Sequence, residues 1–447
     1  MDKEHIVKEI AKRVRDKGGR TYYVGGYVRD KIMGIDSKDI DVEVHGIKDT
    51  DFKNILKNFG YVNEVGKSFG VYMIKGLDVD FSLPTVERKT GEGHTGFDVE
   101  VEPFLGEENA SKRRDFTMNA IMEDVITGDI KDYFKGIEDI KNNVIRVVDE
   151  NTFKEDSLRV YRMAQFASRF NFRIEERSKH IAKGMDVREL SIERVNEEFR
   201  KGLVKSKKPS VFMEILRELG VMKDIFPEIY ELIGCEQNKK FHPEGDVYNH
   251  TLLVLDEASK LKHEVEDEYA FMLAALFHDI GKPKSKEIID GEIKTYGHDE
   301  IGSEMIRGIF RRTLMRDKDV IKYVEVLTKN HMRPRWLYPK GSKKAFRKLA
   351  REGFIEDLFK LVEADTLGRG GTTKEDFKIY DEFFKEKMES LNLKEEIKPI
   401  VTGKDLINMG MKPGKDLGKV KNIAFEWQLE GMDRGSILER LEKEIFN

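Results

Sequence analysis

The 447-residue chain has little cysteine and proline and no long apolar segment. Its single cysteine, Cys235, excludes an intrachain disulfide framework and favours a reducing compartment. The 10 prolines and the lack of low-complexity runs argue against long disordered linkers. No stretch has the length of a membrane span, and the amphipathic segment 1–20 lacks the apolar core of a secretory signal. We therefore expect a soluble, cytoplasmic protein with no membrane partner.

An excess of one charge sign is also missing. The 80 Lys and Arg residues nearly balance the 84 Asp and Glu residues, which leaves a formal net charge of −4. A nucleic-acid partner would therefore have to be bound by local basic surface. One basic cluster lies at 201–208, and a second cluster at 340–351 contains the candidate RNA-binding residues Lys343, Lys344 and Arg347. Such runs are also typical of solvated helix faces.

The pattern of apolar residues predicts an α+β protein with several domains. A small mixed head with short strands at 21–24, 40–44, 71–74, 79–83 and 98–101 is followed by almost wholly helical sequence. Asn151 and Thr152 are candidate caps of the first long helix after the head. We expect a head over 1–140, a helical neck over 141–208, a histidine-rich helical domain over 209–372 and a helical tail over 373–447.

The most informative pattern combines a glycine pair with two alternating acids. Residues 25–30 read GGYVRD, and residues 39–41 read DID. Gly25 and Gly26 let backbone amides approach a phosphate without an intervening Cβ atom. Asp39 and Asp41 alternate in an apolar context, so a strand would project both carboxylates from one face. Together they predict a site for a divalent ion, Mg²⁺, and a nucleoside triphosphate.

Two further segments of the head carry related groups. Asp80 lies on another alternating strand and can add a third acid to the metal site, although an exposed strand aspartate would look the same. Arg113 and Arg114 precede Asp115, and guanidinium groups bind phosphate oxygens in a bidentate manner. Asp115 can accept a hydrogen bond from a ribose hydroxyl, or it can serve only as a helix cap.

The neck motif EDSLRVYR occupies residues 155–162. On a helix, Asp156 and Arg159 would stand three residues apart on one face, as in many surface ion pairs. The pair can also read a base, because the carboxylate accepts from an exocyclic amino group and the guanidinium donates to the adjacent ring nitrogen. Cytosine and adenine present that order of groups, whereas uracil and guanine present the reverse. The motif therefore predicts selection of CTP and ATP.

The motifs GGYVRD, DID, RRDFTMNA and EDSLRVYR together resemble the class II tRNA nucleotidyltransferase and bacterial poly(A) polymerase family. The resemblance implies a polymerase β-type nucleotidyltransferase head in which an RNA 3′-hydroxyl attacks the α-phosphate in line, without a protein base. Gln165 departs from the pattern, because many relatives have arginine there. The implied roles are nucleotide contact for Gly26 and Arg29, Mg²⁺ binding for Asp39 and Asp41, triphosphate or sugar contact for Arg114 and Asp115, and a nucleotide template formed by Asp156, Arg159 and Arg162.

Six of the ten histidines lie between His242 and His331. His250, the adjacent His278-Asp279 and Asp365 follow one another in the order H…HD…D, which resembles the HD phosphohydrolase superfamily. Imidazole and carboxylate ligands suit transition metals such as Mn²⁺, Fe²⁺, Ni²⁺ or Co²⁺, and ligands from several helices would enclose the ion in a bundle. A lone histidine is more often a core residue. His298 and His331 are further candidates, for a second metal or for phosphate, and His242 and His263 rank behind them.

The segments ERKTG (87–91), FHPE (241–244) and EAD (363–365) extend the resemblance to the HD-containing multifunctional CCA-adding enzymes of bacteria. This family implies addition of CMP and AMP to the tRNA 3′ end, and phosphatase or 2′,3′-cyclic phosphodiesterase activity in the HD domain. The alternatives within the class are a CC- or A-adding enzyme and a poly(A) polymerase, although the retained segment 89–112 favours full CCA addition. The alternative outside it is an HD-dominated RNA-end phosphohydrolase with a binding-only head. No protein partner is evident.

Overall fold

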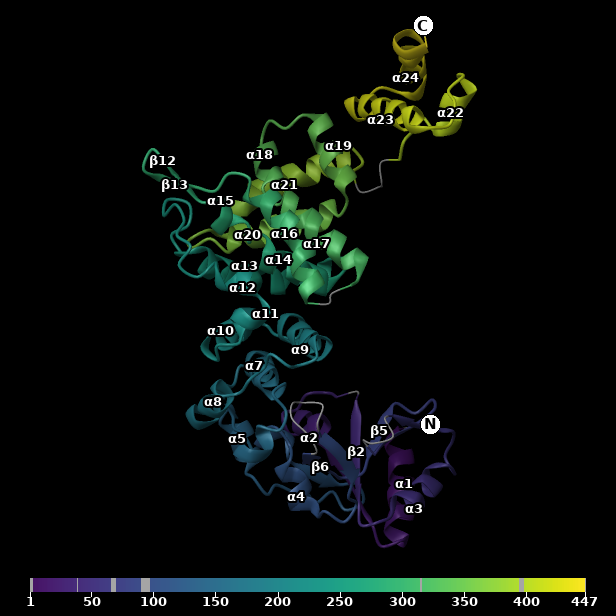
Figure 1. Cartoon of the computed structure of the whole chain (residues 1–447), viewed down its shortest axis with the longest axis vertical. Helices are drawn as coiled ribbons and strands as arrows, with labels where there is room; N and C mark the ends of the chain where they lie inside the picture. Colours follow the sequence, from purple (N-terminus) through teal and green to yellow (C-terminus); the bar gives the residue numbers. More distant parts are fainter. Residues whose placement is uncertain are drawn as a thin grey trace. The chain divides into compact units, whose positions relative to one another are not determined.

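The computed structural model describes residues 3–37, 39–65, 70–89, 97–313, 316–393 and 398–446. The chain divides into two compact units, one formed by Met1–Ser206 with Val211–Asp224 and the other by Lys207–Ser210 with Ile225–Asn447. A sheet with flanking helices begins the first unit, and the second unit is almost wholly helical (Figure 1). The predicted α+β class is therefore confirmed. Among the described residues, no helix combines the length and the apolarity needed to cross a membrane.

The head is built on a sheet whose strand order is β3-β4-β5-β2-β1-β8-β9 in the described part of the chain. Strand β2 pairs antiparallel with β1 and parallel with β5, which places Asp41 opposite Asp80. Every residue of β2 except Asp41 is buried, so the strand holds Asp41 on a rigid support, and Asp39 directly precedes it. The strands of this sheet are β1 (Arg20–Val24), β2 (Ile40–His45), β3 (Val62–Val65), β4 (Val71–Ile74), β5 (Val79–Ser82), β8 (Met122–Asp124) and β9 (Ile130–Lys131).

The other elements of the head and neck are helices and short strand pairs. The strand runs predicted from sequence correspond to β1, β2, β4, β5 and β7, whereas the sequence did not predict β3, β6 and β8 to β11. The elements are α1 (Lys3–Asp16), α2 (Gly25–Ile32), α3 (Asp49–Leu56), β6 (Thr85–Lys89), β7 (Phe97–Val101), α4 (Glu107–Lys112), α5 (Gly136–Lys141), β10 (Val144–Ile145), α6 (Glu150–Phe153), α7 (Arg159–Phe170), β11 (Arg173–Ile174), α8 (Glu176–Lys183), α9 (Ile192–Val204), α10 (Pro209–Glu218) and α11 (Met222–Ile225).

The start of the neck corrects one prediction. The expected caps Asn151 and Thr152 lie inside the short helix α6, and the cap is Asp149, whose carboxylate accepts hydrogen bonds from both of their backbone amides. The long helix α7 begins only at Arg159 and has no side-chain cap. Its stability therefore comes mainly from its buried face, which includes Tyr161.

The second unit packs its helices around a core to which α14 contributes an almost fully apolar, buried segment. Such a helix is hydrophobic on all sides because other helices surround it. Its elements are α12 (Pro227–Tyr230), α13 (Val247–Leu261), α14 (Glu268–Phe277), α15 (Lys282–Ser285), β12 (Glu287–Ile289), β13 (Glu292–Lys294), α16 (His298–Arg312), α17 (Lys318–Asn330), α18 (Arg333–Leu337), α19 (Lys343–Glu352), α20 (Ile355–Leu367), α21 (Lys374–Ser390), α22 (Gly403–Asn408), α23 (Lys415–Glu430) and α24 (Arg434–Leu441).

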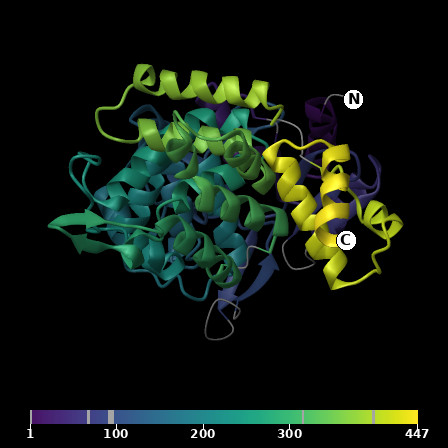
Figure 2. The same cartoon turned by 90° about the horizontal axis from the view of Figure 1, so that it is seen from above.

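The last three helices, α22 to α24, form a small core of their own, and Figure 2 shows them together in yellow. Leu406, Trp427 and Ile437 are among the buried residues of this core. Thr402 and Asp405 form a capping box at the start of α22, so each satisfies a backbone amide that the helix leaves unpaired. The tail is therefore a folded helical element rather than an extended peptide.

Candidate functional site

A cavity of about 490 Å³ in the head and neck brings together the residues predicted to bind a nucleotide. It is lined by the glycine turn, by Asp39 and Asp41, and by residues from the start of α7. Asp80 is not among the described residues that line this cavity, although it lies opposite Asp41 on the neighbouring strand β5. The predicted residues on its wall are Gly25, Gly26, Arg29, Asp39, Asp41, Arg114, Asp115, Asp156, Arg159 and Arg162.

The glycine turn needs glycine at its first position. Gly25 has a φ of +63°, a backbone conformation that residues with a side chain rarely adopt. A Cβ atom there would lie 3.4 Å from Oδ2 of Asp41 and 3.6 Å from Nη1 of Arg114. The turn therefore lies directly against one acid and one cation of the cavity, where a phosphate could approach its backbone.

The carboxylates at the end of β2 influence one another's ionisation. Burial raises the pKa of Asp41; the charge of Arg114 opposes this rise, and the charges of Asp80 and Asp39 add to it. Burial also raises the pKa of Asp80, with contributions from Asp78 and Asp39. Grouped like charges of this kind are stabilised by a divalent cation, so the acids fit such an ion. Asp80 contributes to the local charge from the neighbouring strand rather than from the cavity wall.

A buried chain of hydrogen bonds connects the glycine helix to the neck. Arg29 donates from Nη1 to Oδ1 of Asn119 at 2.7 Å, and Asn119 donates from Nδ2 to Oδ1 of Asp115 at 2.9 Å. Arg162 donates from Nε to Oδ2 of Asp115 at 2.8 Å. Although burial opposes it, the charge of Arg162 and the hydrogen bond from Asn119 hold the pKa of Asp115 below its usual value. The chain fixes two cationic side chains on the cavity wall.

The proposed base-reading pair is arranged differently from its prediction. Asp156 does not lie on a helix, because it precedes α7 and its Oδ1 accepts the backbone amide of Leu158 at 3.1 Å. Its Oδ2 lies 2.7 Å from Nη2 of Arg194, a cavity residue that the sequence did not indicate. Arg159 donates from Nη1 to the carbonyl of Thr152 and from Nη2 to the carbonyl of Arg113, each at 2.7 Å. Both members of the pair are thus held in place by other groups.

The two basic clusters have different surroundings. Lys201 and Lys205 line the head cavity together with Arg194. In the other cluster, Lys344 forms an ion pair with Glu430, and Arg347 donates to the carbonyl of Leu429 at 3.2 Å, whereas Lys343 is exposed. Two of the three residues predicted to bind RNA therefore contact the end of α23. In the ERKTG motif, Thr90 and Gly91 lie outside the described residues.

A second constellation lies in the helical unit, around Asp279. Oδ2 of Asp279 lies 3.2 Å from Nε2 of His278 and 3.7 Å from Nε2 of His250. Oδ1 lies 3.3 Å from Nε2 of His298 and 3.6 Å from Nε2 of His331. The structure thus brings together the predicted HD residues, with two histidines on each oxygen of one carboxylate. Asp365 adds a second carboxylate beside His250 and His278, since its Oδ1 lies 3.0 Å from Nε2 of His250.

The hydrogen bonds of three of these histidines determine which nitrogen faces Asp279. Nδ1 of His278 lies 2.8 Å from the carbonyl oxygen of Ala275, and Nδ1 of His298 and of His331 each lies 2.7 Å from a backbone carbonyl. A carbonyl oxygen only accepts, so Nδ1 carries a proton in each ring, and Nε2 presents a lone pair whenever the ring is neutral. Burial lowers the pKa of His331, which favours this neutral form. Histidine nitrogens whose lone pairs point toward a carboxylate form, together with it, a set of ligands that suits a divalent metal ion.

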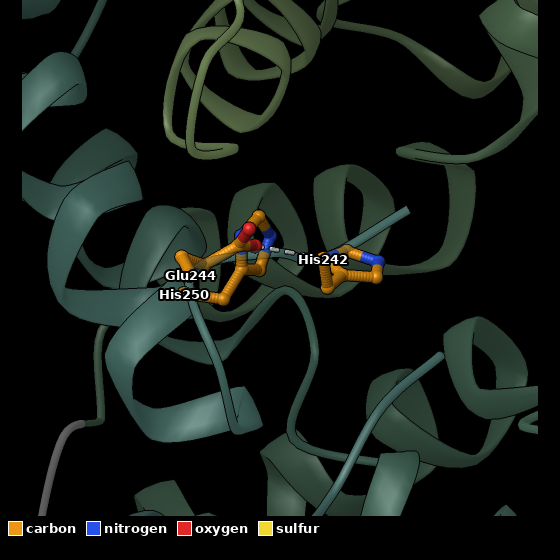
Figure 3. Close-up of side chains that lie close together, drawn as sticks. All are labelled: His242, Glu244 and His250. Atoms are coloured by element: carbon orange, nitrogen blue, oxygen red, sulfur yellow. Dashed lines mark hydrogen bonds and ion pairs between the residues drawn. The ribbon is translucent and has the colours of Figure 1, made fainter. Parts of the chain in front are cut away.

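Glu244 contacts Nδ1 of His250, the ring nitrogen that does not face Asp279. Its Oε1 lies 2.8 Å from Nδ1 of His250 and 2.9 Å from Nδ1 of His242 (Figure 3). Although burial opposes it, these two contacts hold the pKa of Glu244 well below its usual value. A carboxylate behind a metal-binding histidine fixes the orientation of its ring. His242 therefore belongs to the surroundings of the centre, although the sequence ranked it low.

Three cations beside this centre were not predicted as functional residues. Lys282 lies 2.6 Å from Oδ2 of Asp279, and Arg335 and Arg369 lie 3.1 Å and 3.6 Å from Oδ2 of Asp365. Although burial opposes it, Arg335 and His250 hold the pKa of Asp365 well below its usual value. Lys282 directly follows the HDIG segment, so its position could have been noticed from the sequence. Arg335 had no such signal, because α18 is distant from the other motifs along the chain.

Comparison with known families matches three segments of the chain. Residues 21–146 match the Poly A polymerase head domain, residues 171–232 match the model described as a probable RNA and SrmB-binding site of polymerase A, and residues 247–371 match the HD domain. The first match includes the glycine turn and the acid pair, and the third includes the histidine centre. These two domains imply binding of divalent metal ions.

Curated relatives and solved structures cover more of the chain. The multifunctional CCA protein of Mannheimia succiniciproducens is 34% identical over 366 residues, which are 79% of this chain and 85% of that protein. The corresponding protein of Methylobacillus flagellatus is 33% identical over 367 residues, with the same coverage of 79% and 85%. The CCA-adding enzyme of Bacillus stearothermophilus in complex with CTP has the same fold, with a TM-score of 0.68 at 20% identity and coverage of 99% and 98%.

Proposed function

Because the chain belongs to the family of multifunctional CCA proteins, we propose that it restores the 3′ CCA end of tRNA by adding CMP and AMP from CTP and ATP. The observation that carries this proposal is the head cavity, which combines the glycine turn, the acid pair, Arg114 and the Asp156–Arg159 pair in one place. Solved structures with a similar fold are complexes of a CCA-adding enzyme with tRNA, with ATP and with CTP. We assign the activity to the cytoplasm, where tRNA is used.

In this proposal the acid pair and the glycine turn position the triphosphate. Asp39 and Asp41 would hold Mg²⁺, and the bound ion would lower the pKa of the attacking hydroxyl and neutralise charge on the leaving pyrophosphate. Gly25 and Gly26 allow backbone contact with phosphate, and Arg114 balances its charge from beside Asp41. The RNA 3′-hydroxyl oxygen bonds to the α-phosphorus as the bond to pyrophosphate breaks. Lys343 remains our candidate for RNA contact in the helical unit.

Asp156 and Arg159 select the base. Two backbone carbonyls orient the Arg159 guanidinium, and Arg194 and the Leu158 amide orient the Asp156 carboxylate. A reading pair that is already oriented loses little entropy when a base binds, which favours discrimination. Cytosine and adenine offer an amino group next to an acceptor nitrogen, and this order matches a carboxylate next to a guanidinium.

The proposal is tested with tRNAs that lack CCA, CA or A, each incubated with one labelled nucleotide. We expect CTP to label the tRNAs that lack CCA or CA, and ATP to label the tRNA that lacks only the terminal A. Asp41→Asn should reduce addition by roughly 100-fold or more, whereas Asp36→Asn, an exposed aspartate outside the cavity, should not. Incorporation of UTP or GTP at similar rates would contradict base selection.

For the helical unit we propose a metal-dependent phosphohydrolase that acts on RNA 3′ ends, including 2′,3′-cyclic phosphates. His250, His278, Asp279 and Asp365 would hold one transition metal ion such as Ni²⁺, Mn²⁺ or Co²⁺, and Asp279 with His298 and His331 would hold a second. Such ions act as Lewis acids on a phosphoryl oxygen. The water oxygen bonds to phosphorus, one ester bond breaks and the leaving sugar oxygen takes a proton. Lys282, Arg335 and Arg369 lie where they can bind the phosphate.

This second activity is tested with 2′,3′-cyclic AMP and protein loaded with Ni²⁺, Mn²⁺ or Co²⁺. His278→Asn should abolish hydrolysis and leave CTP addition intact, and Asp41→Asn should have the opposite effect. His263→Asn is the matched control, because His263 is an exposed histidine of the same unit. If Asp39→Asn and Asp41→Asn left every activity unchanged, the chain would instead be an HD-dominated phosphohydrolase with a binding head.

A further inference from the structure

Gln165 is buried on the wall of the nucleotide cavity, and the nitrogen of its side-chain amide has no hydrogen-bond partner among the described residues. It is 1% exposed, and the unpartnered nitrogen is Nε2. A buried amide N–H₂ without a partner is unfavourable, and such groups in folded proteins are nearly always satisfied. Because Gln165 lines the cavity, a molecule bound there can supply the missing acceptor.

The position of Gln165 on α7 indicates which part of a ligand it would meet. Arg159, Arg162, Gln165 and Arg169 recur every three or four residues and all line the cavity, so they share one face of the helix. Gln165 lies six residues beyond Arg159, about 9 Å along the helix axis. It is therefore displaced from the base-reading pair by more than the width of a base.

The immediate surroundings of Gln165 are cationic. Phe166, the next residue, has the guanidinium carbons of Arg29 and Arg162 at 5.1 Å and 5.2 Å from its ring centre. Arg162 and Arg169 flank Gln165 on the same helix face. Groups of this charge attract the sugar–triphosphate part of a nucleotide rather than its base. A neutral amide donor placed among them can bond to a hydroxyl or phosphate oxygen without adding charge.

We propose that the Gln165 amide donates a hydrogen bond to a sugar or phosphate oxygen of the incoming nucleotide, a contact that CTP and ATP share. This inference rests on the proposed function of the head. It gives Gln165 a role in binding strength that does not depend on the base, whereas Asp156 and Arg159 discriminate between bases. Many relatives have arginine at this position, so Gln165 places a neutral hydrogen-bond donor where they have a charged one.

The test compares dissociation constants of CTP and ATP, measured calorimetrically with Mg²⁺ and without RNA, for wild type and Gln165→Met. Methionine keeps the length of the side chain and removes the donor. We expect both dissociation constants to rise by the same factor, about fivefold. Gln165→Glu should weaken binding further, because a carboxylate would face phosphate. Met163→Leu is the control, since Met163 is buried on α7 away from the cavity lining.

Thermal unfolding separates this contact from a structural role. Without nucleotide, Gln165→Met should unfold at no lower temperature than wild type, because it removes an unsatisfied donor. With saturating CTP or ATP, its upward shift should be smaller than that of wild type. Unchanged dissociation constants, or a change for one nucleotide only, would overturn the proposal. Failure of wild type to bind either nucleotide would instead reject the proposed function of the head.

The sugar and phosphate sources are distinguished with 2′-deoxy-CTP and 2′-deoxy-ATP. If the acceptor is the 2′-hydroxyl, wild type and Gln165→Met will bind the deoxynucleotides equally well. If the acceptor is a phosphate oxygen, the 3′-hydroxyl or the sugar ring oxygen, the fivefold ratio will persist. Both results support the contact and assign its acceptor.

Discussion

The Nε2 atoms of His298 and His331 face each other at 3.3 Å, while the Nδ1 atom of each lies 2.7 Å from a backbone carbonyl oxygen. When both rings are neutral with Nδ1 protonated, both Nε2 atoms are acceptors and cannot bond to each other. Oδ1 of Asp279 lies within 3.6 Å of both. Three electron-pair donors oriented toward one point are stabilised by a cation between them.

Substitution of His331 should therefore remove one metal ion without removing the other. Protein loaded with Ni²⁺ or Mn²⁺ and dialysed against Mg²⁺ should retain two transition metal ions per chain, measured by mass spectrometry. His331→Ala should retain one, because His250, His278, Asp279 and Asp365 remain as ligands. His263→Ala should retain two. Equal metal content in wild type and His331→Ala would argue against the second ion.

A glycine after the HD pair keeps α16 close to Asp279. A Cβ atom at Gly281 would lie 2.1 Å from the carbonyl oxygen of His298 and 2.7 Å from the amide nitrogen of Gly302. Gly281→Ala should therefore push the start of α16 away, lower stability by about 1–3 kcal/mol and weaken the second metal site.

Gly308→Ala provides the control for that substitution. Gly308 lies within α16, and a Cβ atom there would meet nothing within 4 Å. Alanine at this position should leave metal binding unchanged and stabilise the protein by up to about 1 kcal/mol, because it favours the helix. Urea unfolding and metal titration of the two variants measure both effects. Equal behaviour of the two variants would show that close packing at Gly281 is unimportant.

The parts of the sites that were predictable from sequence are those whose residues are near neighbours in the chain. The acids of DID and the pair His278-Asp279 are oriented by a single strand or helix end, so their local pattern was sufficient. Glu244 could not be recognised in this way, because its contact with His250 depends on how the segment before α13 folds back. Asp156 was misplaced, because a turn bond to Leu158 replaced the expected helix.

Charge runs were less informative for the same reason. The sequence shows that Lys344 and Arg347 are basic, but not that Glu430 and the Leu429 carbonyl, more than eighty residues away, contact them. In contrast, Lys201 and Lys205 line a cavity. Only the tertiary structure shows which basic residues line a cavity, and Lys201 does so although it also pairs with Glu198.

The glycine turn of the head allows the phosphate contact to be separated from backbone strain. Gly25 and Gly34 have similar φ values of +63° and +70°, but only at Gly25 would a Cβ atom contact cavity residues. Both alanine variants should lose about 1–2 kcal/mol of stability from the left-handed backbone. Only Gly25→Ala should also weaken CTP and ATP binding, measured calorimetrically. Equal nucleotide affinity in the two variants would argue against phosphate binding at the turn.

Acid sensitivity of the head should follow from the buried carboxylate of Asp115, which pairs with the partly exposed Arg162. The pKa of Asp115 is lower in the folded protein than in the unfolded chain, where it is about 3.9. At pH values between the folded pKa and this unfolded value, the unfolded chain binds more protons than the folded protein does. The free energy of unfolding therefore rises with pH in this range. The contribution of Asp115 is thus fully present above about pH 5 and is lost as the pH falls through its folded pKa.

Asp115→Asn removes this titrating charge and leaves Arg162 without its anionic partner. We expect it to lower the free energy of unfolding by about 1.5–3 kcal/mol at pH 7. The difference from wild type should shrink as the pH falls through the folded pKa of Asp115, where the wild-type carboxyl becomes protonated, in urea unfolding experiments without nucleotide. Asp186→Asn is the control, because Asp186 pairs with Arg188 at an exposed site and should matter little at any pH. A difference between wild type and Asp115→Asn that stays constant with pH would show that Asp115 does not control the acid response.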